Sequence, residues 1–154
     1  MFPSTQATAA PVRVPPAVVE FPPEPGVLPR DAFGAVEDED HIVVLGGQGP
    51  ELMCALLRAG ATNVTHLRTH ERPEAGGASL LIVPRPPSLD WLAAALPSIR
   101  RALSDGGRLA IHTGAPGTGQ TQVRRMLTLH GFRAIRATAD GRWLSGDLPP
   151  KRSV

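Results

Sequence analysis

The amino-acid sequence predicts a three-layer α/β fold of Rossmann-like type, with a mostly parallel sheet and an antiparallel hairpin at its C-terminal end. Short apolar segments rich in β-branched residues alternate with longer segments of helical periodicity, as in parallel strands joined by helices. The last two strand-like segments are separated only by Ala139–Gly141, which is typical of a tight hairpin turn. A chain of 154 residues is long enough for one such domain and too short for two.

Composition divides the chain into a proline-rich segment and a domain. Eight of the 17 prolines precede Arg30. Proline removes a backbone donor and fixes φ, so this stretch suits neither a helix nor a central strand. We therefore expect an extended or disordered segment at residues 1–36, the α/β domain at 37–150 and a short C-terminal tail at 151–154. The core must be mainly aliphatic, because aromatic residues make up only 4% of the chain.

The first half of the domain reads as strand, helix, strand and loop. Ile42–Leu45 is a short apolar run with β-branched residues, as expected for a strand that is covered on both faces. Pro50 suits the first turn of a helix, whose apolar residues recur at helical spacing until Gly60 stops it. Asn63–Leu67 is the second predicted strand, and the polar, glycine-containing stretch Arg68–Gly77 is a predicted loop.

The second half supplies the remaining strands and helices. Ser79–Val83 is a third buried strand, and Ser88 is a good N-cap for the helix that follows. Pro97 lies inside this helix, so we expect a kink there or a break into two short helices. The other predicted elements are a Gly-Gly turn at 105–107, a strand at 108–112, a helix that stops at Gly131, and hairpin strands at 132–138 and 142–145.

The net charge and the cysteine content indicate which class of binding partner and which cellular compartment to expect. A formal net charge of +2, with arginines scattered along the sequence, argues against a nucleic-acid partner without excluding one. No apolar run approaches the ~20 residues of a membrane span, and the N-terminal residues lack the basic and apolar regions of a signal peptide. The single cysteine, Cys54, rules out an intrachain disulfide and indicates a reducing, cytoplasmic location. We expect its side chain to be buried as a small apolar group.

The segment Leu96–Thr113, LPSIRRALSDGGRLAIHT, resembles the core of class I S-adenosylmethionine-dependent methyltransferases. In that family a helix leads through a Gly-Gly turn into the strand beside the cofactor site. The helix, glycine stop and hairpin of Val123–Leu144 follow the same order, and the resemblance covers about the last two thirds of the chain. It implies a reduced methyltransferase core, because the connection from the second strand to Leu80 is too short for the family's usual third strand and its helix.

The glycine-rich turn after the first strand is the main candidate for ligand binding. Glycines there let the backbone approach a nucleotide-like ligand closely, and the following helix presents free N–H groups. The resemblance implies that this turn contacts the amino-acid part of S-adenosylmethionine. The residues at these positions are Gly46, Gly47, Gln48 and Gly49. A tight strand-to-helix turn without a ligand is the structural alternative.

Two acidic residues of the family pattern are missing. Val43 and Val44 stand where the family usually has an acid just before the glycine turn. At the end of the second strand, where the family places a carboxylate for the ribose hydroxyls, the chain has His66 to Thr69, and Glu71 is the nearest acid. Both departures weaken the expectation of tight cofactor binding.

The end of the third strand holds two further candidates. Pro84 and Arg85 occupy the place where many family members carry residues that contact the substrate or cofactor. A structural role as a strand terminator is the alternative for this proline-rich segment. His112 ends a predicted central strand, and either a base or a hydrogen-bonded structural histidine would fit it. We expect no metal site, because His66 and His70 lie on a strand-to-loop segment rather than on one helical face.

Three functions remain open on these residues. The first is a small S-adenosylmethionine-dependent methyltransferase-like protein that binds the cofactor with weak or lost catalysis. The second is a non-catalytic interaction or regulatory module on a degenerate methyltransferase fold. The third is an NAD(P)-binding Rossmann domain, because Leu57–Thr65 also resembles the first helix-to-strand passage of dehydrogenases. The methyl acceptor and any protein partner are not indicated.

Overall fold

The fold is taken from a computed structural model that describes residues 30–150, apart from 35, 38, 48 and 115–117. The predictions for residues 1–29 and 151–154 therefore lie outside the described residues. The elements in chain order are α1 (Arg30–Phe33), β1 (His41–Leu45), α2 (Gly49–Arg58), β2 (Asn63–Leu67), β3 (Ala78–Val83), α3 (Leu89–Ala102), β4 (Leu103–His112), α4 (Thr118–Leu129), β5 (Arg133–Ala137) and β6 (Trp143–Asp147).

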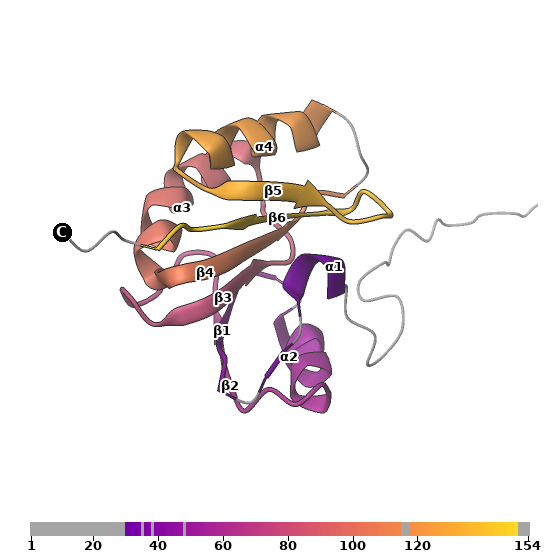
Figure 1. The fold of residues 1–154 in the computed structure, drawn as a ribbon, viewed down its shortest axis with the longest axis vertical. Coiled ribbons are helices and arrows are strands. Elements are labelled where there is room, and N and C mark those ends of the chain that lie inside the picture. The colour runs from indigo at the N-terminus through magenta and orange to yellow at the C-terminus, as the bar shows by residue number, and fades with distance from the viewer. Residues whose placement is uncertain (1–29, 35, 38, 48, 115–117, 151–154) are drawn as a thin grey trace, which may run out of the picture.

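The six strands form one sheet in the order β2-β1-β3-β4-β6-β5 (Figure 1). Strands β2, β1, β3 and β4 are parallel, and β6 pairs antiparallel with both β4 and β5. This arrangement confirms the predicted mostly parallel sheet with a C-terminal antiparallel hairpin. Because the chain continues from β1 to β2 on one side and then to β3 on the other, β1 and β3 flank the topological switch point, where α/β sheets commonly bind ligands.

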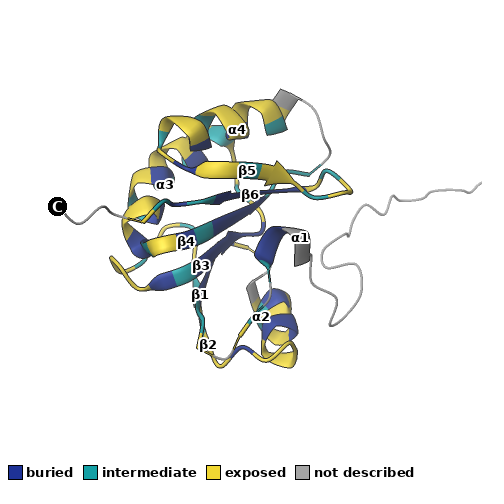
Figure 2. Ribbon diagram, in the orientation of Figure 1, coloured by how far each residue is buried: buried dark blue, intermediate teal, exposed yellow. Residues whose placement is uncertain are grey.

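Helices cover both faces of the sheet, which gives the three predicted layers. Alternating side chains of the parallel strands point to opposite faces, so each buried strand contributes to two separate clusters. One cluster packs α3 and α4 against the sheet through Leu96, Ile99 and Leu127. The other packs α1 and α2 against the opposite face through Phe33, Leu52 and Leu56. Figure 2 shows that burial is concentrated in the central strands and falls off toward β2 and β5.

The short helix α1 is an element that the sequence analysis missed. Residues up to 36 were expected to be extended, yet Ala32 and Phe33 are buried in the core. The ring of Phe33 packs edge-on against Trp143 of β6, with centroids 5.1 Å apart and an interplanar angle of 87°. This aromatic contact, about 110 residues away in the sequence, explains why local composition did not reveal the helix.

Helix α3 begins at its predicted cap and continues past its proline. The Ser88 hydroxyl accepts a hydrogen bond from the Trp91 N–H at 3.0 Å. Of the two expectations at Pro97, a kink or a break into two short helices, the break is wrong, since α3 is one helix through Pro97. Pro97 and Ala93, whose carbonyl loses its helical partner, are both exposed, so water can satisfy that carbonyl.

The predicted Gly-Gly turn before β4 is part of the strand instead. Strand β4 begins at Leu103, which pairs with Ala78, and the register then shifts through a bulge before Arg108 pairs with Leu80. Gly106 has φ +77° within this bulge. The Gly107 carbonyl accepts a hydrogen bond from the Leu148 N–H at 2.8 Å. The two glycines thus allow a long strand to bend while it stays paired.

The sheet ends on β2 at one side, as the reduced methyltransferase core predicts. Between Leu67 and Ala78 the structure contains neither a further strand nor a helix. The segment Arg68–Gly77 crosses directly from β2 to β3 as a loop. Strand β2 is accordingly an edge strand whose residues are exposed or half-buried.

The turn of the terminal hairpin is organised by Asp140. Its carboxylate accepts hydrogen bonds from the Thr138 hydroxyl and from the Arg142 N–H. These bonds, led by the one from Thr138, and the nearby positive charge of Arg142 hold the pKa of Asp140 below its ordinary value of 3.8.

We therefore expect the hairpin to weaken in acid. A carboxyl group with a lowered folded-state pKa contributes its full stabilisation above the unfolded value of 3.8, and loses it as the pH falls through the lower folded value. Asp140→Asn should lower the urea midpoint at pH 7 by a small amount, because the group is exposed. The difference from wild type should shrink as the pH falls from 7 through 3.8 and below it. A difference that does not change with pH would contradict this role for the charge.

Candidate functional site

The glycine turn lies at the carboxyl end of β1, as predicted, and is tied to the end of β2. Gly46 has φ +108°, a conformation that side-chain-bearing residues rarely adopt. Its N–H donates to the Leu67 carbonyl at 2.8 Å, and its carbonyl accepts a hydrogen bond from His66 Nε2 at 2.9 Å. Because a carbonyl oxygen only accepts, His66 Nε2 is the donor of this bond, which helps to position the turn.

The ends of three strands converge on this turn. A Cβ at Gly46 would lie 3.4 Å from Thr69 Cγ2, which follows β2, and 3.9 Å from the Arg85 carbonyl oxygen, which follows β3. Gly47 differs, because it is exposed and a Cβ there would have no neighbour within 4 Å among the described residues. Gly49 begins α2, and Gln48 lies outside the described residues. The backbone at Gly47 is thus open to a ligand.

The first turn of α2 adds positive potential beside Gly47. Helix α2 has ten residues, and the N–H groups of its first turn have no helical partners. Such a helix end favours a carboxylate or a phosphate group. The exposed carboxylate of Glu51 lies in the same turn and is stabilised by the same positive potential. A ligand anion at this end would have to bind beside the Glu51 carboxylate.

The two residues after β3, Pro84 and Arg85, differ in burial. Pro84 is buried against the end of the strand, whereas the Arg85 side chain is exposed. The backbone carbonyl of Arg85 faces the turn at Gly46. Pro84 therefore packs at the end of β3, and Arg85 lies beside the glycine turn at the same edge of the sheet.

The loop after β2 is fastened to α3. The Trp91 indole N–H donates to the Thr69 carbonyl at 3.1 Å. Glu71 folds back on its own loop, because its carboxylate accepts from the Arg68 N–H at 2.7 Å. A cavity of about 160 Å³ lies between this loop and α3, with Leu45, Thr69, Glu71 and Trp91 in its lining. Sequence reasoning did not indicate this role of Trp91, because nothing local signals a contact across 22 residues.

Comparison with known proteins identifies the fold. No family model and no curated protein matches the chain. Among solved structures, an S-adenosylmethionine-dependent methyltransferase from Mesorhizobium loti superposes with a TM-score of 0.59 at 12% identity, over 77% of this chain and 95% of that one. An O-methyltransferase from Thermotoga maritima gives 0.56 at 14% identity, over 77% of this chain and 63% of that one.

The human N-acetylserotonin methyltransferase in complex with S-adenosylmethionine gives a TM-score of 0.57 at 13% identity, over 71% of this chain and 48% of the human one. The chain adopts the fold of the class I S-adenosylmethionine-dependent methyltransferases. The chain spans 63% of the length of the Thermotoga maritima structure and 48% of that of the human one, so it corresponds to only part of each.

Relative to this methyltransferase fold, the strand before the glycine turn carries no acid. Val43 is 5% exposed and Val44 is fully buried, and they pack into the two clusters on opposite faces of the sheet. A carboxylate in either position would lose its hydration without a partner. The apolar core of this methyltransferase-like domain therefore extends to the edge of the turn.

His112 lies on a methyltransferase-like β4 but packs as a structural side chain. Its ring meets Trp143 edge-on, with centroids 5.0 Å apart and an interplanar angle of 81°. It is half-buried, and its charge helps to lower the pKa of Asp140 in the hairpin turn. The His112 ring thus lies against Trp143 and close enough to the hairpin turn to affect Asp140.

A larger cavity lies at the opposite, amino-terminal edge of the sheet. Its volume is about 970 Å³, and its lining includes Arg100, Arg101, Ser104 and His130. These residues end α3, begin β4 or follow α4. The sequence analysis did not predict this cavity, because its lining comes from four segments that are distant in the chain.

Three further features bear on the chemistry of the domain. Cys54 is exposed on α2, so the expectation that it is buried is wrong. Within the described ranges, no three His, Cys, Asp or Glu side chains gather closely enough to hold a metal ion. No helix in the same part of the chain is long and apolar enough to cross a bilayer.

Proposed function

We propose that this domain binds S-adenosylmethionine at the carboxyl edge of β1 and β3, and that its methyltransferase activity is weak or lost. One observation carries the proposal: the exposed, unobstructed backbone of Gly47 lies beside the switch point of a methyltransferase-like sheet. The methionine part of the cofactor would lie on Gly46 and Gly47, with its carboxylate at the first turn of α2. Arg85 and Pro84 would border the same site.

Weak or lost catalysis is supported by the chemistry around the turn. The buried Val43 and Val44 offer no acceptor to the cofactor's amino group. The ribose hydroxyls would have to use Glu71, which is four residues beyond the end of β2 and already accepts a bond from the Arg68 N–H. A cofactor bound through fewer acceptors is held less firmly, and methyl transfer depends on firm positioning.

A non-catalytic interaction module on the same fold is the main alternative, and the same missing acids favour it. The NAD(P)-binding alternative is less well supported. An antiparallel β6 separates β4 from β5 here, whereas the doubly wound dinucleotide-binding sheet is built from parallel strands in two βαβαβ halves. The exposed free thiol of Cys54 supports a reducing, cytoplasmic location for any of these functions.

Isothermal titration calorimetry of the full chain separates these alternatives. S-Adenosylmethionine and S-adenosylhomocysteine should each release or absorb measurable heat, whereas NAD⁺ and NADP⁺ should not. Absence of heat with all four ligands would contradict the proposal and favour the interaction module. Heat with only the nicotinamide cofactors would favour the dinucleotide-binding alternative.

Glu71→Gln should weaken S-adenosylmethionine binding by about tenfold or more, because a hydrogen bond to a charged group contributes ~1.5–3 kcal/mol. The substituted amide oxygen can still accept from the Arg68 N–H, so the loop should keep its fold. Glu74→Gln, an exposed acid of the same loop, is the matched control and should bind like wild type. Equal affinities for the two variants would remove Glu71 from the ribose site.

A further inference from the structure

Charge is distributed unevenly along this chain. Residues 106–154 contain eight basic and two acidic side chains, a formal net charge of +6, whereas residues 1–105 contain eight basic and twelve acidic side chains, a net charge of −4. No Asp or Glu occurs between Asp105 and Asp140. This acid-free stretch contains five arginines, at positions 108, 124, 125, 133 and 136.

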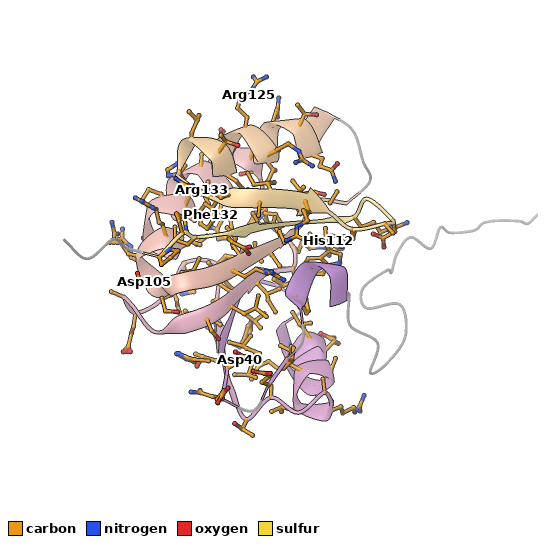
Figure 3. All side chains as sticks on the ribbon, in the orientation of Figure 1. Asp40, Asp105, His112, Arg125, Phe132 and Arg133 are labelled. Atoms are coloured by element: carbon orange, nitrogen blue, oxygen red, sulfur yellow. The ribbon has the colours of Figure 1, made fainter. Side chains whose placement is uncertain are left out.

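The fold gathers four of these arginines around the edge strand β5. We call Arg124, Arg125, Arg133 and Arg136 the arginine margin; all four are exposed. Arg124 reaches from α4 to β5, where its Nη1 donates to the Ile135 carbonyl at 3.1 Å. Figure 3 shows Arg125 projecting from α4 away from the sheet, and Arg133 at the beginning of β5.

The two strand arginines lie on the sheet face opposite α4. Arg133 and Arg136 are directly across from Asp147 and Ser145 of β6, so each pair shares a face. Trp143, Ser145 and Asp147 are two residues apart along β6, so their side chains point to the same face of the sheet. Trp143 packs against α1 on that face. The arginine margin therefore wraps around the outer strand, with cations on its edge and on both sides.

These four cations lack carboxylate partners within the described part of the chain. The ion pair at this end of the sheet joins Arg108 to Asp147, with Nε and Oδ1 at 2.9 Å. Asp147 is thus already engaged where Arg133 faces it. Asp140, in the hairpin turn, is bound by Thr138 and by the Arg142 N–H. The margin keeps a local charge of about +4, which attracts a polyanion.

The neighbouring side chains favour phosphate groups over a protein partner. Protein interfaces are built on clusters of aromatic or aliphatic anchors. The exposed apolar neighbours of the margin are Ala134 and Ala137 on β5 and a single large side chain, Leu129 on α4, which do not make such a cluster. The described phenylalanines and Trp143 are at most 5% exposed, so single-stranded bases have no ring to stack on here. Guanidinium groups bind phosphate oxygens through two parallel hydrogen bonds.

We propose that the arginine margin binds the phosphate backbone of double-stranded nucleic acid without reading its sequence. This surface is distinct from the glycine turn, and the proposal does not depend on cofactor binding. The contact is electrostatic, so its affinity falls steeply with salt. The scattered arginines of the sequence thus become one surface only in the folded chain.

Fluorescence anisotropy with a labelled DNA duplex of about 20 base pairs, in a series of KCl concentrations, tests the proposal. Four phosphate contacts should give a slope of log K against log[KCl] of about −3.6. The double variant R133Q/R136Q should bind more weakly, with a slope reduced in magnitude by about 1.8. Both side chains are exposed on an edge strand, so the thermal midpoint should not change.

The matched control is R58Q/R72Q, which removes two exposed arginines from α2 and from the loop after β2. This variant should keep the wild-type affinity and slope. Equal losses in the two double variants would overturn the proposal, as would the absence of binding to the duplex at low salt. Displacement of the duplex by polyglutamate as readily as by unlabelled duplex would assign the surface to an acidic protein instead.

Discussion

Gly47→Val should abolish S-adenosylmethionine binding, with a loss of affinity of at least about a hundredfold, while the thermal midpoint stays within a degree or two of wild type. The new side chain would occupy the open space over the turn, where the cofactor is proposed to lie. Side-chain atoms in the cofactor's position would exclude the cofactor and so remove its binding free energy. A substitution at an exposed position, in contrast, changes the free energy of unfolding by only about ±0.5 kcal/mol. Calorimetric titration and differential scanning calorimetry measure the two effects on the same sample.

Two comparison variants make this result specific. Ala93→Val adds side-chain atoms at an exposed position of α3 and should leave binding unchanged, with a loss of stability of about 0.5 kcal/mol from its lower helix propensity. Gly46→Ala should instead lower stability by about 1–2 kcal/mol, because φ is +108° there. Wild-type affinity in Gly47→Val would show that the turn is a structural connection without a ligand.

Gly107→Ala should destabilise the domain by about 3 kcal/mol, which is a large part of the stability of a small domain. A Cβ there would lie 2.9 Å from the Ser104 carbonyl oxygen and 3.1 Å from that of Ala78. Ala78 pairs with Leu103 of β4, and its carbonyl also accepts a hydrogen bond from the Ser104 hydroxyl. Moving the Ala78 carbonyl away from a new Cβ would disturb both contacts.

Gly106→Ala is the matched control for this effect. A Cβ at Gly106 has no neighbour within 4 Å, so the cost arises only from its φ of +77° and should be about 1 kcal/mol. Urea unfolding should therefore place the midpoint of Gly107→Ala well below that of Gly106→Ala. Equal midpoints would mean that the bulge can widen, and that its close packing does not determine stability.

The parts of the fold that the sequence predicted correctly are those with strong local patterns. Strands β1 and β3 are continuous apolar runs, and such runs suit strands covered on both faces. Ser88 and the spacing of Leu92, Leu96 and Ile99 define the beginning and the buried face of α3. The hairpin was recognisable because Asp140-Gly141 is a turn sequence with strand-like residues on both sides.

The parts that the sequence did not predict depend on contacts between distant residues. Helix α1 owes its place to Phe33 packing on Trp143. Strand β4 continues through Gly106 and Gly107 because Ala78 of β3 pairs with Leu103, which no local pattern shows.

The candidate site could be predicted in part. The glycine turn was recognised from its position after a buried strand, because a parallel sheet places such turns at its carboxyl edge. The bonds that hold the turn, from His66 and to Leu67, follow from the pairing of β1 with β2. The arginine margin did leave a signal in the sequence, the absence of acids between Asp105 and Asp140, but only the fold places those arginines together.

A titration of ¹⁵N-labelled protein with S-adenosylhomocysteine, followed by amide chemical shifts, tests whether the cofactor site is at the glycine turn. The largest shifts are expected at Gly46, Gly47 and the first turn of α2, with smaller shifts at Arg85. Shifts confined to Gly76 and Ser104, at the large cavity of the opposite edge, would contradict this placement. So would unchanged spectra at saturating ligand.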